Sequence, residues 1–306
     1  MTAEAAGSPA RTTTFPFEQV VVIFNPHSTG SAPELAEQLR NDLERRLPRT
    51  PVHLSPTEHA GHARDLAGNA APTPRTLIVS VSGDGGYNEV VDGVMQAGDT
   101  GTVCAVMAAG NANDHRRTTG EEPLADAIVA GEVRHLDLLR LTIGHGPDAV
   151  VRYAHSYIGM GLTPIVAVDL EKGGKGSLRE MVSVVRTFAR FRPFTVTLED
   201  GTRRDFDSLL FANIAQMAKY ATLSETDQPD DGRFEVIALP HTSKWKVLGV
   251  AIRAATRGLG PQPTATRYSF VTHKPTPLQL DGEVLPLQAN TPVHVEIAPG
   301  ALATLG

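Results

Sequence analysis

The chain of 306 residues lacks several features that large protein classes require. Cys104 is its only cysteine, which excludes intramolecular disulfides and multi-cysteine zinc sites, and the apolar run around it predicts a buried, inert thiol. The net charge of −6 argues against a nucleic-acid binder or a strongly electrostatic membrane binder, because both depend on clustered Lys and Arg. No uncharged stretch approaches the roughly 18 apolar residues of a membrane span, and residues 1–17 lack a signal peptide's apolar run.

The remaining composition is that of an ordinary globular protein, with 41% hydrophobic and 20% charged residues. The length exceeds a single typical core and predicts two domains. These features predict a cytoplasmic protein that contacts a membrane only at its periphery, transiently at the inner membrane surface. They predict no nucleic-acid partner, and they are compatible with a homodimer.

The first 120 residues repeat one pattern, in which an apolar run leads into a polar turn. The runs at 20–24, 77–82 and 102–107 each open into small and polar residues. Helices are expected at 32–47, 58–69 and 124–130, so strands and helices alternate, which predicts a parallel sheet covered by helices. Because the carboxyl ends of parallel strands share one edge, the three polar turns are expected to line one crevice.

The pattern changes from about residue 138 onward, where apolar and polar residues alternate between turn signals. This alternation predicts antiparallel sheets packed as a sandwich or barrel. The expected strands are 133–141, 152–157, 194–198, 207–212, 234–239 and 268–272, and the expected helices are 178–191 and 244–258. We therefore expect a flexible tail at 1–17, an α/β domain at 18–137 and a β-rich domain at 138–287.

The turn after the second run contains glycines around one acid, Asp84. Glycines let backbone N–H groups approach a phosphate, and a helix N-terminus adds partial positive charge. A carboxylate beside a phosphate is repulsive unless a metal bridges them or the acid has chemistry to perform. This turn therefore indicates nucleotide handling. The alternative is an ordinary strand-to-helix connection in which Asn88 caps the helix.

Five polar elements, in order along the chain, resemble the diacylglycerol kinase catalytic-domain superfamily. This superfamily includes bacterial lipid kinases and sphingosine kinases, with NAD kinases as distant relatives. NPHSTG at 25–30 resembles its Asn-Pro-x-Ser-Gly element, and SGDGGYNE at 82–89 its Gly-Gly-Asp-Gly-Thr-x-Asn-Glu element, with Ser82 closer to the sphingosine kinase version. GNANDHRR at 110–117 resembles Gly-Thr-x-Asn-Asp-Phe-x-Arg. DDGRFEV at 230–236 and DGE at 281–283 resemble two later elements.

The resemblance implies an α/β N-terminal domain with a parallel sheet, as in NAD kinases and diacylglycerol kinases, and a mainly antiparallel β-sandwich second domain. It implies that the domain at 18–137 is nucleotide-binding, that the domain at 138–287 is acceptor-binding, and that residues 288–306 return to the first domain. The implied activity is an ATP-dependent kinase that acts on a lipid hydroxyl of the diacylglycerol or sphingoid type, with Mg²⁺ as cofactor and a place in phospholipid biosynthesis.

The resemblance also implies roles for individual residues. Asp84 and Glu283 are the catalytic candidates, since one carboxylate must accept the proton of the acceptor hydroxyl, and Asp231 is a candidate to assist a metal. The implied nucleotide-binding residues are Asn25, Ser28, Thr29, Gly30, Gly83, Gly85, Gly86, Asn88, Glu89, Gly110, Asn111, Asn113, Asp114 and Arg117. Taken alone, Asp281-Gly282 is also a strong signal for a two-residue hairpin turn.

Three positions depart from the family elements. Gly86 and Asn111 stand where the family has threonine, and His115 stands where it has an aromatic residue. These departures motivate a second hypothesis, a catalytically silent nucleotide- or lipid-binding module. A third hypothesis is a kinase of a soluble acceptor, because the distant NAD kinases share the glycine-acid turn.

Overall fold

The computed structural model describes residues 16–28, 31–98, 101–109, 122–161, 193–214, 216–217, 221–222, 229–243, 246–247, 249–250, 253 and 257–305. The expected helix at 178–191 and the nucleotide-binding candidates Thr29, Gly30, Gly110, Asn111, Asn113, Asp114 and Arg117 lie outside these residues, as do His115 and most of the expected helix at 244–258. Among the helices of the described ranges, none combines the length and apolar character needed to cross a membrane.

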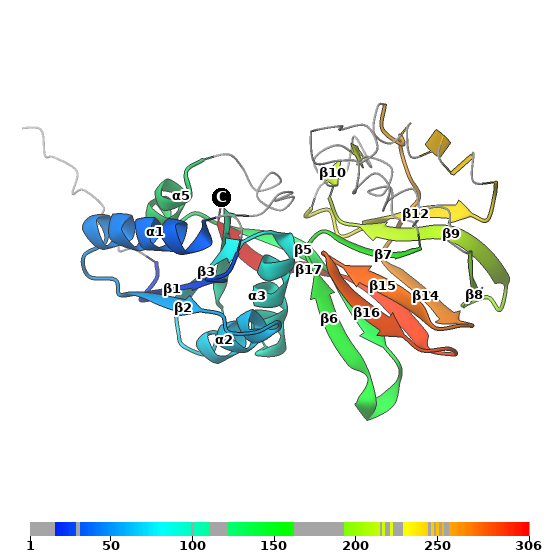
Figure 1. Cartoon of the computed structure of the whole chain (residues 1–306), viewed down its shortest axis with the longest axis horizontal. Helices are drawn as coiled ribbons and strands as arrows, with labels where there is room; N and C mark the ends of the chain where they lie inside the picture. Colours follow the sequence, from blue (N-terminus) through cyan, green and yellow to red (C-terminus); the bar gives the residue numbers. More distant parts are fainter. Residues whose placement is uncertain are drawn as a thin grey trace, which may run out of the picture.

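The first domain is built on parallel strands with helices on both sides (Figure 1). The strand order is β2-β1-β3-β4, and each neighbouring pair is parallel. The elements are β1 (Gln19–Phe24), α1 (Ala32–Arg46), β2 (Val52–Pro56), α2 (His62–Ala70), β3 (Thr76–Ser82), α3 (Asp84–Gln96), β4 (Val103–Ala108) and α5 (Leu124–Ala130).

Alternation along each buried strand sends successive side chains to opposite faces of this sheet. Val20 and Val22 of β1 pack in one cluster with Leu39 and Leu43 of α1 and with residues of α5. Val21 and Ile23 pack in the opposite cluster with α2 and α3. A sheet buried on both faces needs continuous apolar strands, and this explains why β1 and β3 read as unbroken apolar runs.

The second domain is mainly antiparallel, as its alternating sequence predicts. Its elements are β5 (Val133–Ile143), the short 3-10 helix η1 (Gly146–Asp148), β6 (Val150–Ala154), β7 (Tyr157–Gly161), β8 (Phe194–Leu198), β9 (Arg203–Ala212), β10 (Gln216–Met217), β11 (Ala221–Thr222), β12 (Phe234–Pro240), β13 (Thr264–Ala265), β14 (Arg267–Thr272), β15 (Thr276–Leu280), β16 (Glu283–Leu287) and β17 (Pro292–Leu305). Its core gathers aromatic side chains such as Phe211, Phe234 and Phe270.

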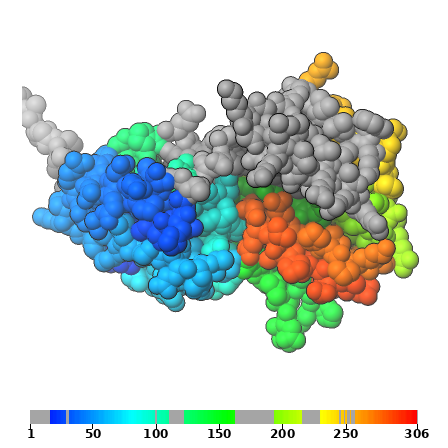
Figure 2. Space-filling model, viewed as in Figure 1, coloured from blue at the N-terminus to red at the C-terminus, as the bar shows by residue number. Residues whose placement is uncertain are grey.

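The long final strand, β17, joins the two domains. Its first part pairs with β14 of the second domain, and Thr304 near its end pairs with Cys104 of β4 in the first. Strand β5 accompanies β17 along both parts. The two domains therefore lie side by side (Figures 1 and 2), and the C-terminus lies in the first domain (Figure 1).

The boundaries of two expected elements are wrong. The expected strand at 152–157 is broken into β6 and β7 by a bend at His155 and Ser156. The bend turns three consecutive backbone N–H groups onto the buried carboxylate of Asp281. The helix expected at 58–69 begins later, at His62, behind Gly61, whose positive φ of 83° suits glycine.

Cys104 is fully buried in β4, as predicted, and burial raises the pKa of its thiol to about 12. A thiolate is the reactive form, so the folded protein is expected to resist a thiol reagent such as DTNB at about pH 8. Unfolding in guanidinium should release one reactive thiol per chain. Fast labelling of the folded protein would contradict the buried position.

Candidate active site

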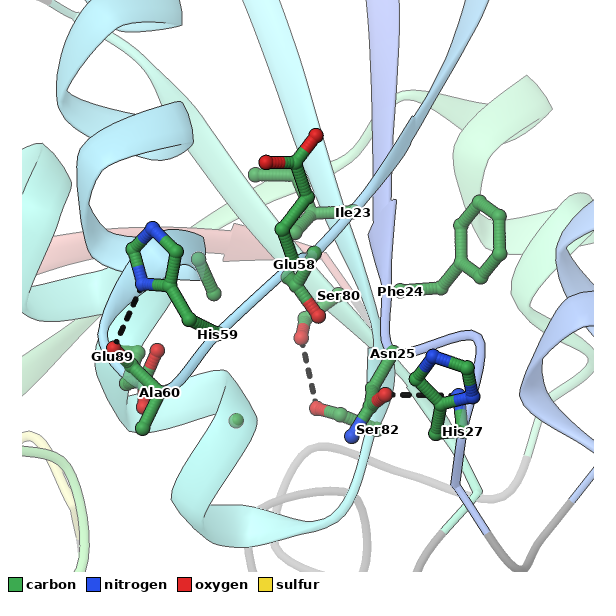
Figure 3. Close-up of a pocket in the computed structure, with 13 residues that line it drawn as sticks. Ile23, Phe24, Asn25, His27, Glu58, His59, Ala60, Ser80, Ser82 and Glu89 are labelled. Carbon is green, nitrogen blue, oxygen red and sulfur yellow. Dashed lines mark hydrogen bonds between the residues drawn. The ribbon is translucent and has the colours of Figure 1, made fainter.

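A cavity of about 450 Å³ opens where the strands β1, β2 and β3 end (Figure 3). Residues at the ends of these strands form part of its wall: Asn25 and Thr57 directly follow β1 and β2, and Ser82 is the last residue of β3. This is the edge at which parallel α/β sheets bind ligands. The lining residues are Ile23, Phe24, Asn25, His27, Thr57, Glu58, His59, Ala60, Ala63, Ser80, Ser82, Gly86 and Glu89.

The glycine-acid turn lies at one side of this cavity and is shorter than expected. Strand β3 ends at Ser82, Gly83 is the N-cap, and α3 already begins at Asp84, whose side chain is partly exposed. Gly85 and Gly86 are therefore first-turn residues whose N–H groups have no partner within the helix, which is the arrangement that attracts an anion. Asn88 lies in the second turn, so its suggested role as helix cap is wrong.

The first polar turn reaches the same cavity through Asn25 and His27. The side-chain oxygen of Asn25 accepts a hydrogen bond from the backbone N–H of His27 at 2.8 Å. The backbone carbonyl oxygen of Asn25 accepts one from the backbone N–H of Ser28 at 3.2 Å. Ser28 is not among the lining residues. Two of the three predicted turns thus meet at one cavity, while the third lies outside the described residues.

The two remaining candidates of α3 face different neighbours. Glu89 lines the cavity and accepts a hydrogen bond from the backbone N–H of Gly61 at 3.1 Å, which joins α3 to the start of α2. Asn88 is buried, and its Nδ2 donates to the carbonyl oxygen of Tyr153 at 3.2 Å and to Oδ2 of Asp281 at 3.4 Å. In this structure Asn88 therefore connects the two domains.

The Asp281-Gly282 pair forms the two-residue turn between β15 and β16, with φ values of 43° and 95°. The backbone of this hairpin lies against the glycine-acid turn, because a Cβ built on Gly85 would be 3.6 Å from the carbonyl oxygen of Asp281. Asp281-Gly282 therefore forms the hairpin turn that its sequence predicts and also contacts the glycine-acid turn.

The carboxylate of Asp281 is buried and is surrounded by donors. The backbone N–H groups of His155, Ser156 and Tyr157 donate to it at 2.7, 3.2 and 2.7 Å. Burial raises the pKa of the Asp281 carboxyl, while the neighbouring His155 and these backbone hydrogen bonds act in the opposite direction. Nε2 of His155 also lies 3.4 Å from the carbonyl oxygen of Asp84. Asp281 thus holds the second domain's turn against the start of α3.

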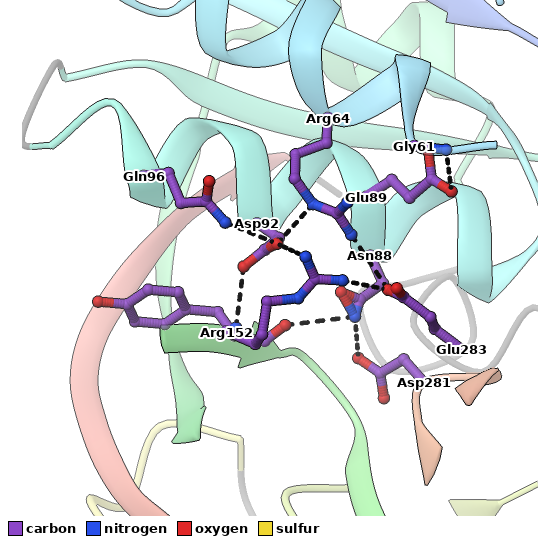
Figure 4. Close-up of polar contacts among 10 residues, drawn as sticks. Gly61, Arg64, Asn88, Glu89, Asp92, Gln96, Arg152, Asp281 and Glu283 are labelled. Atoms are coloured by element: carbon purple, nitrogen blue, oxygen red, sulfur yellow. Dashed lines mark hydrogen bonds and ion pairs between the residues drawn. The ribbon is translucent and has the colours of Figure 1, made fainter. Parts of the chain in front are cut away.

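Glu283, next along the hairpin, is held by two arginines (Figure 4). Its Oε2 pairs with Nη2 of Arg64, at 3.0 Å, and with Nη2 of Arg152. Both arginines also pair with the fully buried Asp92, at 2.6 Å from Nε of Arg64 and 3.2 Å from Nη1 of Arg152. Two cations and two carboxylates alternate across the domain contact, and this arrangement orients Glu283 beside α3.

Arg64, Asp92, Arg152 and His155 were not among the candidates from the sequence. One signal was available for Asp92, since Asp84, Asn88, Asp92 and Gln96 recur every four residues and therefore share one face of α3. That polar stripe faces the second domain along its middle: Asn88 contacts Tyr153, and Asp92 accepts the N–H of the same residue at 3.0 Å. Thr57 to Ala60 could be found from the rule that all strand ends at one sheet edge contribute to the site.

Asp231 accepts a hydrogen bond from the backbone N–H of Arg233 at 2.9 Å, as a turn-forming aspartate does. Within the described ranges, no three His, Cys, Asp or Glu side chains gather to hold a metal ion. This observation is compatible with Mg²⁺, which keeps several waters and takes one or two carboxylates together with substrate phosphates. The partly exposed Asp84 is a donor of that kind.

Gly85 offers a direct test of the anion site. Gly85→Val places a branched side chain where backbone N–H groups must approach the nucleotide, so we expect ATP affinity to fall by more than tenfold, or more than about 1.4 kcal/mol. Gly85→Ala is the matched variant, because its Cβ makes only an ordinary contact with Asp281. Unchanged ATP binding by a folded Gly85→Val protein would contradict the placement of the phosphates.

Residues 19–141 match the diacylglycerol kinase catalytic domain. This match confirms the predicted resemblance to the diacylglycerol kinase catalytic-domain superfamily. Two curated relatives carry related names. The diacylglycerol kinase of Bacillus subtilis is 26% identical over 284 residues, which cover 86% of this chain and 88% of the relative. A protein of Chromohalobacter salexigens named "Probable lipid kinase YegS-like" is 25% identical over 241 residues, 74% of this chain and 76% of the relative.

Solved structures share the whole fold. A diacylglycerol kinase of Bacillus anthracis superimposes with a TM-score of 0.67 at 17% identity, covering 94% of this chain and 97% of that one. Yeast NADH kinase, solved with NADH, superimposes with a TM-score of 0.52 at 12% identity, covering 95% and 83%. The predicted fold class, a parallel α/β domain followed by a mainly antiparallel one, is confirmed.

Proposed function

We propose that this protein is an ATP-dependent lipid kinase, which transfers the γ-phosphoryl group of ATP to a lipid hydroxyl of the diacylglycerol or sphingoid type. The observation that carries the proposal is the contact between the two domains at the glycine-acid turn. The backbone of the Asp281-Gly282 turn lies against Gly85 at the start of α3, and Glu283, next along the hairpin, pairs with Arg64 of α2. The match of residues 19–141 to a kinase catalytic domain supports ATP as phosphoryl donor.

The cavity beside the turn suits a nucleotide. The backbone N–H groups of Gly85 and Gly86, in the first turn of α3, are proposed to bind phosphate oxygens, and Asn25 and His27 contribute polar atoms to the cavity wall. Glu58 and Glu89 also line the cavity, and their charge repels a polyphosphate unless a cation lies between them. When bound, Mg²⁺ neutralises phosphoryl oxygens, and Asp84 is the residue we propose to hold it.

Phosphoryl transfer needs positioning and charge neutralisation more than covalent work by the protein. The chain's own part is to bind the nucleotide along α3, to exclude water at the domain contact and to accept the acceptor's hydroxyl proton. Asp84 and Glu283 are both proposed for the last role. Glu283 comes from the domain to which we assign the acceptor, and the two arginines limit the directions in which its carboxylate can point.

The experiment that tests the function is incubation with labelled ATP, Mg²⁺ and a total lipid extract. We expect label in an organic-extractable product, and more of it when lipid is presented in vesicles or micelles. Label only in a water-soluble product would favour a kinase of a soluble acceptor, the activity type named for the yeast neighbour. ATP binding without any transfer would favour a silent module.

A further inference from the structure

His155 is a buried histidine at the contact between the two domains, and the proposed reaction gives it no part. It lies in the bend between β6 and β7, and its side chain is fully buried. A buried polar ring costs free energy unless its nitrogens find hydrogen-bond partners. The partners of this ring therefore define what it can do.

The hydrogen-bond network assigns a ring proton to Nε2. That nitrogen is 3.4 Å from the carbonyl oxygen of Asp84 and 3.4 Å from Oδ2 of Asp281. A carbonyl oxygen only accepts hydrogen bonds, and so does an ionised carboxylate, so Nε2 must carry the hydrogen that these two oxygens share. On the other side of the ring, Nδ1 is 2.7 Å from Oγ of Ser156, and that hydroxyl can donate to it.

The ring therefore joins two segments that come from different domains. Asp84 is the first residue of α3, whereas Asp281 belongs to the turn between β15 and β16. The ring of Tyr87, also in α3, packs against the imidazole with the two centroids 5.0 Å apart. The imidazole is thus held by its own domain through Ser156 and by the first domain through Tyr87.

The start of α3 needs such a contact because its own backbone is weakly constrained. Gly83 and Gly85 flank Asp84, and glycine has more conformational freedom than any other residue. Gly83 is the N-cap and has no side chain with which to close the first turn. A donor from outside the helix, such as Nε2 of His155, can therefore hold the carbonyl group of Asp84 in place.

We propose that His155 is a positioning residue for phosphoryl transfer, which sets the place of Asp84 relative to Glu283 by holding the Asp84 carbonyl beside the Asp281 carboxylate. This inference rests on the proposed function, in which Asp84 and Glu283 both act. Glu283 follows Asp281 by two positions on the same hairpin, so a shift of Asp84 away from Asp281 also displaces it from Glu283. A misplacement of about 1 Å between reacting groups can slow a reaction about a hundredfold.

The test compares two variants of His155 in the transfer assay with labelled ATP. His155→Leu removes both ring nitrogens, and we expect it to lower kcat by about tenfold or more. The KM for ATP should stay nearly unchanged, because His155 is not among the residues that line the cavity. In His155→Gln the amide nitrogen stands as many bonds from Cα as Nε2 does and can donate in its place, so this variant should recover most of the lost rate.

A double variant tests whether His155 acts through Asp84. In the Asp84→Asn protein the essential charge is already absent, so adding His155→Leu should slow transfer by less than about threefold further. A purely structural role predicts instead that the two losses multiply and that the melting temperature falls. Wild-type kcat in His155→Leu, or losses that multiply in the double variant, would overturn the proposal.

His294→Leu is the matched control for the loss of a histidine. Nδ1 of His294 also contacts a serine hydroxyl, that of Ser269 at 2.9 Å, but it does so on the exposed surface of the second domain. This variant should leave kcat unchanged.

Hydrogen exchange on peptides spanning residues 83–89 gives a readout that needs no transfer. The amide of Tyr87 donates to the carbonyl oxygen of Gly83 at 3.1 Å, and it should exchange faster in His155→Leu than in the wild type or in His155→Gln. Unchanged exchange in His155→Leu would overturn the hold of His155 on this turn. ATP binding without labelled product in the wild-type protein would instead overturn the proposed function.

Discussion

Asp84→Asn is expected to slow phosphoryl transfer at least about a hundredfold while leaving the fold intact. Asparagine keeps the shape of the side chain and its place in the first turn of α3 but removes the charge. That charge is required whether Asp84 accepts a proton or holds the metal, so both proposed roles lead to the same loss. The measurement is the rate at which label from ATP enters the organic-extractable product, at saturating ATP.

Asp65→Asn provides the matched control, because Asp65 is also an acid in the first turn of a helix, α2, but is exposed. It should leave the rate unchanged. A change in helix stability from losing an acid near an N-terminus affects both variants alike, by a few tenths to about 1 kcal/mol. Near-normal transfer by Asp84→Asn would show that the essential carboxylate lies elsewhere.

Much of the site around Asp84 could be predicted because it is local in sequence. A buried strand, a glycine turn and a helix start follow one another within fifteen residues, and each is recognisable from its own composition. The same holds for the hairpin at Asp281-Gly282, where a two-residue turn needs positive φ at both positions. The exact start of α3 was missed because glycines usually interrupt helices, whereas Gly85 and Gly86 lie inside this one.

The contacts between the domains could not be predicted in the same way, because they join residues far apart in the chain. Arg64 and Glu283 are separated by 219 positions, and the sequence around each reads as an ordinary charged surface. The bend at His155 was likewise read as strand, since the carboxylate that holds it belongs to Asp281, 126 positions away. Contacts between distant parts of the chain determine both the ion pair and the bend, and neither local propensity nor periodicity can predict such contacts.

Glu283→Gln is expected to slow transfer at least about a hundredfold and to leave ATP affinity nearly unchanged. The nucleotide cavity is lined by the first domain, and Glu283 is not among its lining residues. Glutamine fills the same space between Arg64 and Arg152 but cannot accept the acceptor's proton. The measurement is the same transfer assay, run beside calorimetric titration with ATP.

A structural role for Glu283 predicts a different result, because the glutamine variant leaves two arginines facing the single carboxylate of Asp92. If Glu283 only holds the domains together, its loss should lower the melting temperature with a small effect on transfer. Glu296→Gln is the control, since Glu296 pairs with Arg140 on the surface, at 47% and 39% side-chain exposure, and an exposed pair of this kind contributes at most about 1 kcal/mol.

Arg152→Lys, which keeps the positive charge but cannot contact Glu283 and Asp92 through two nitrogens at once, separates the two roles of Glu283 further. If Glu283 is the proton acceptor, that variant should slow transfer by misorienting the carboxylate, and it should do so while ATP still binds.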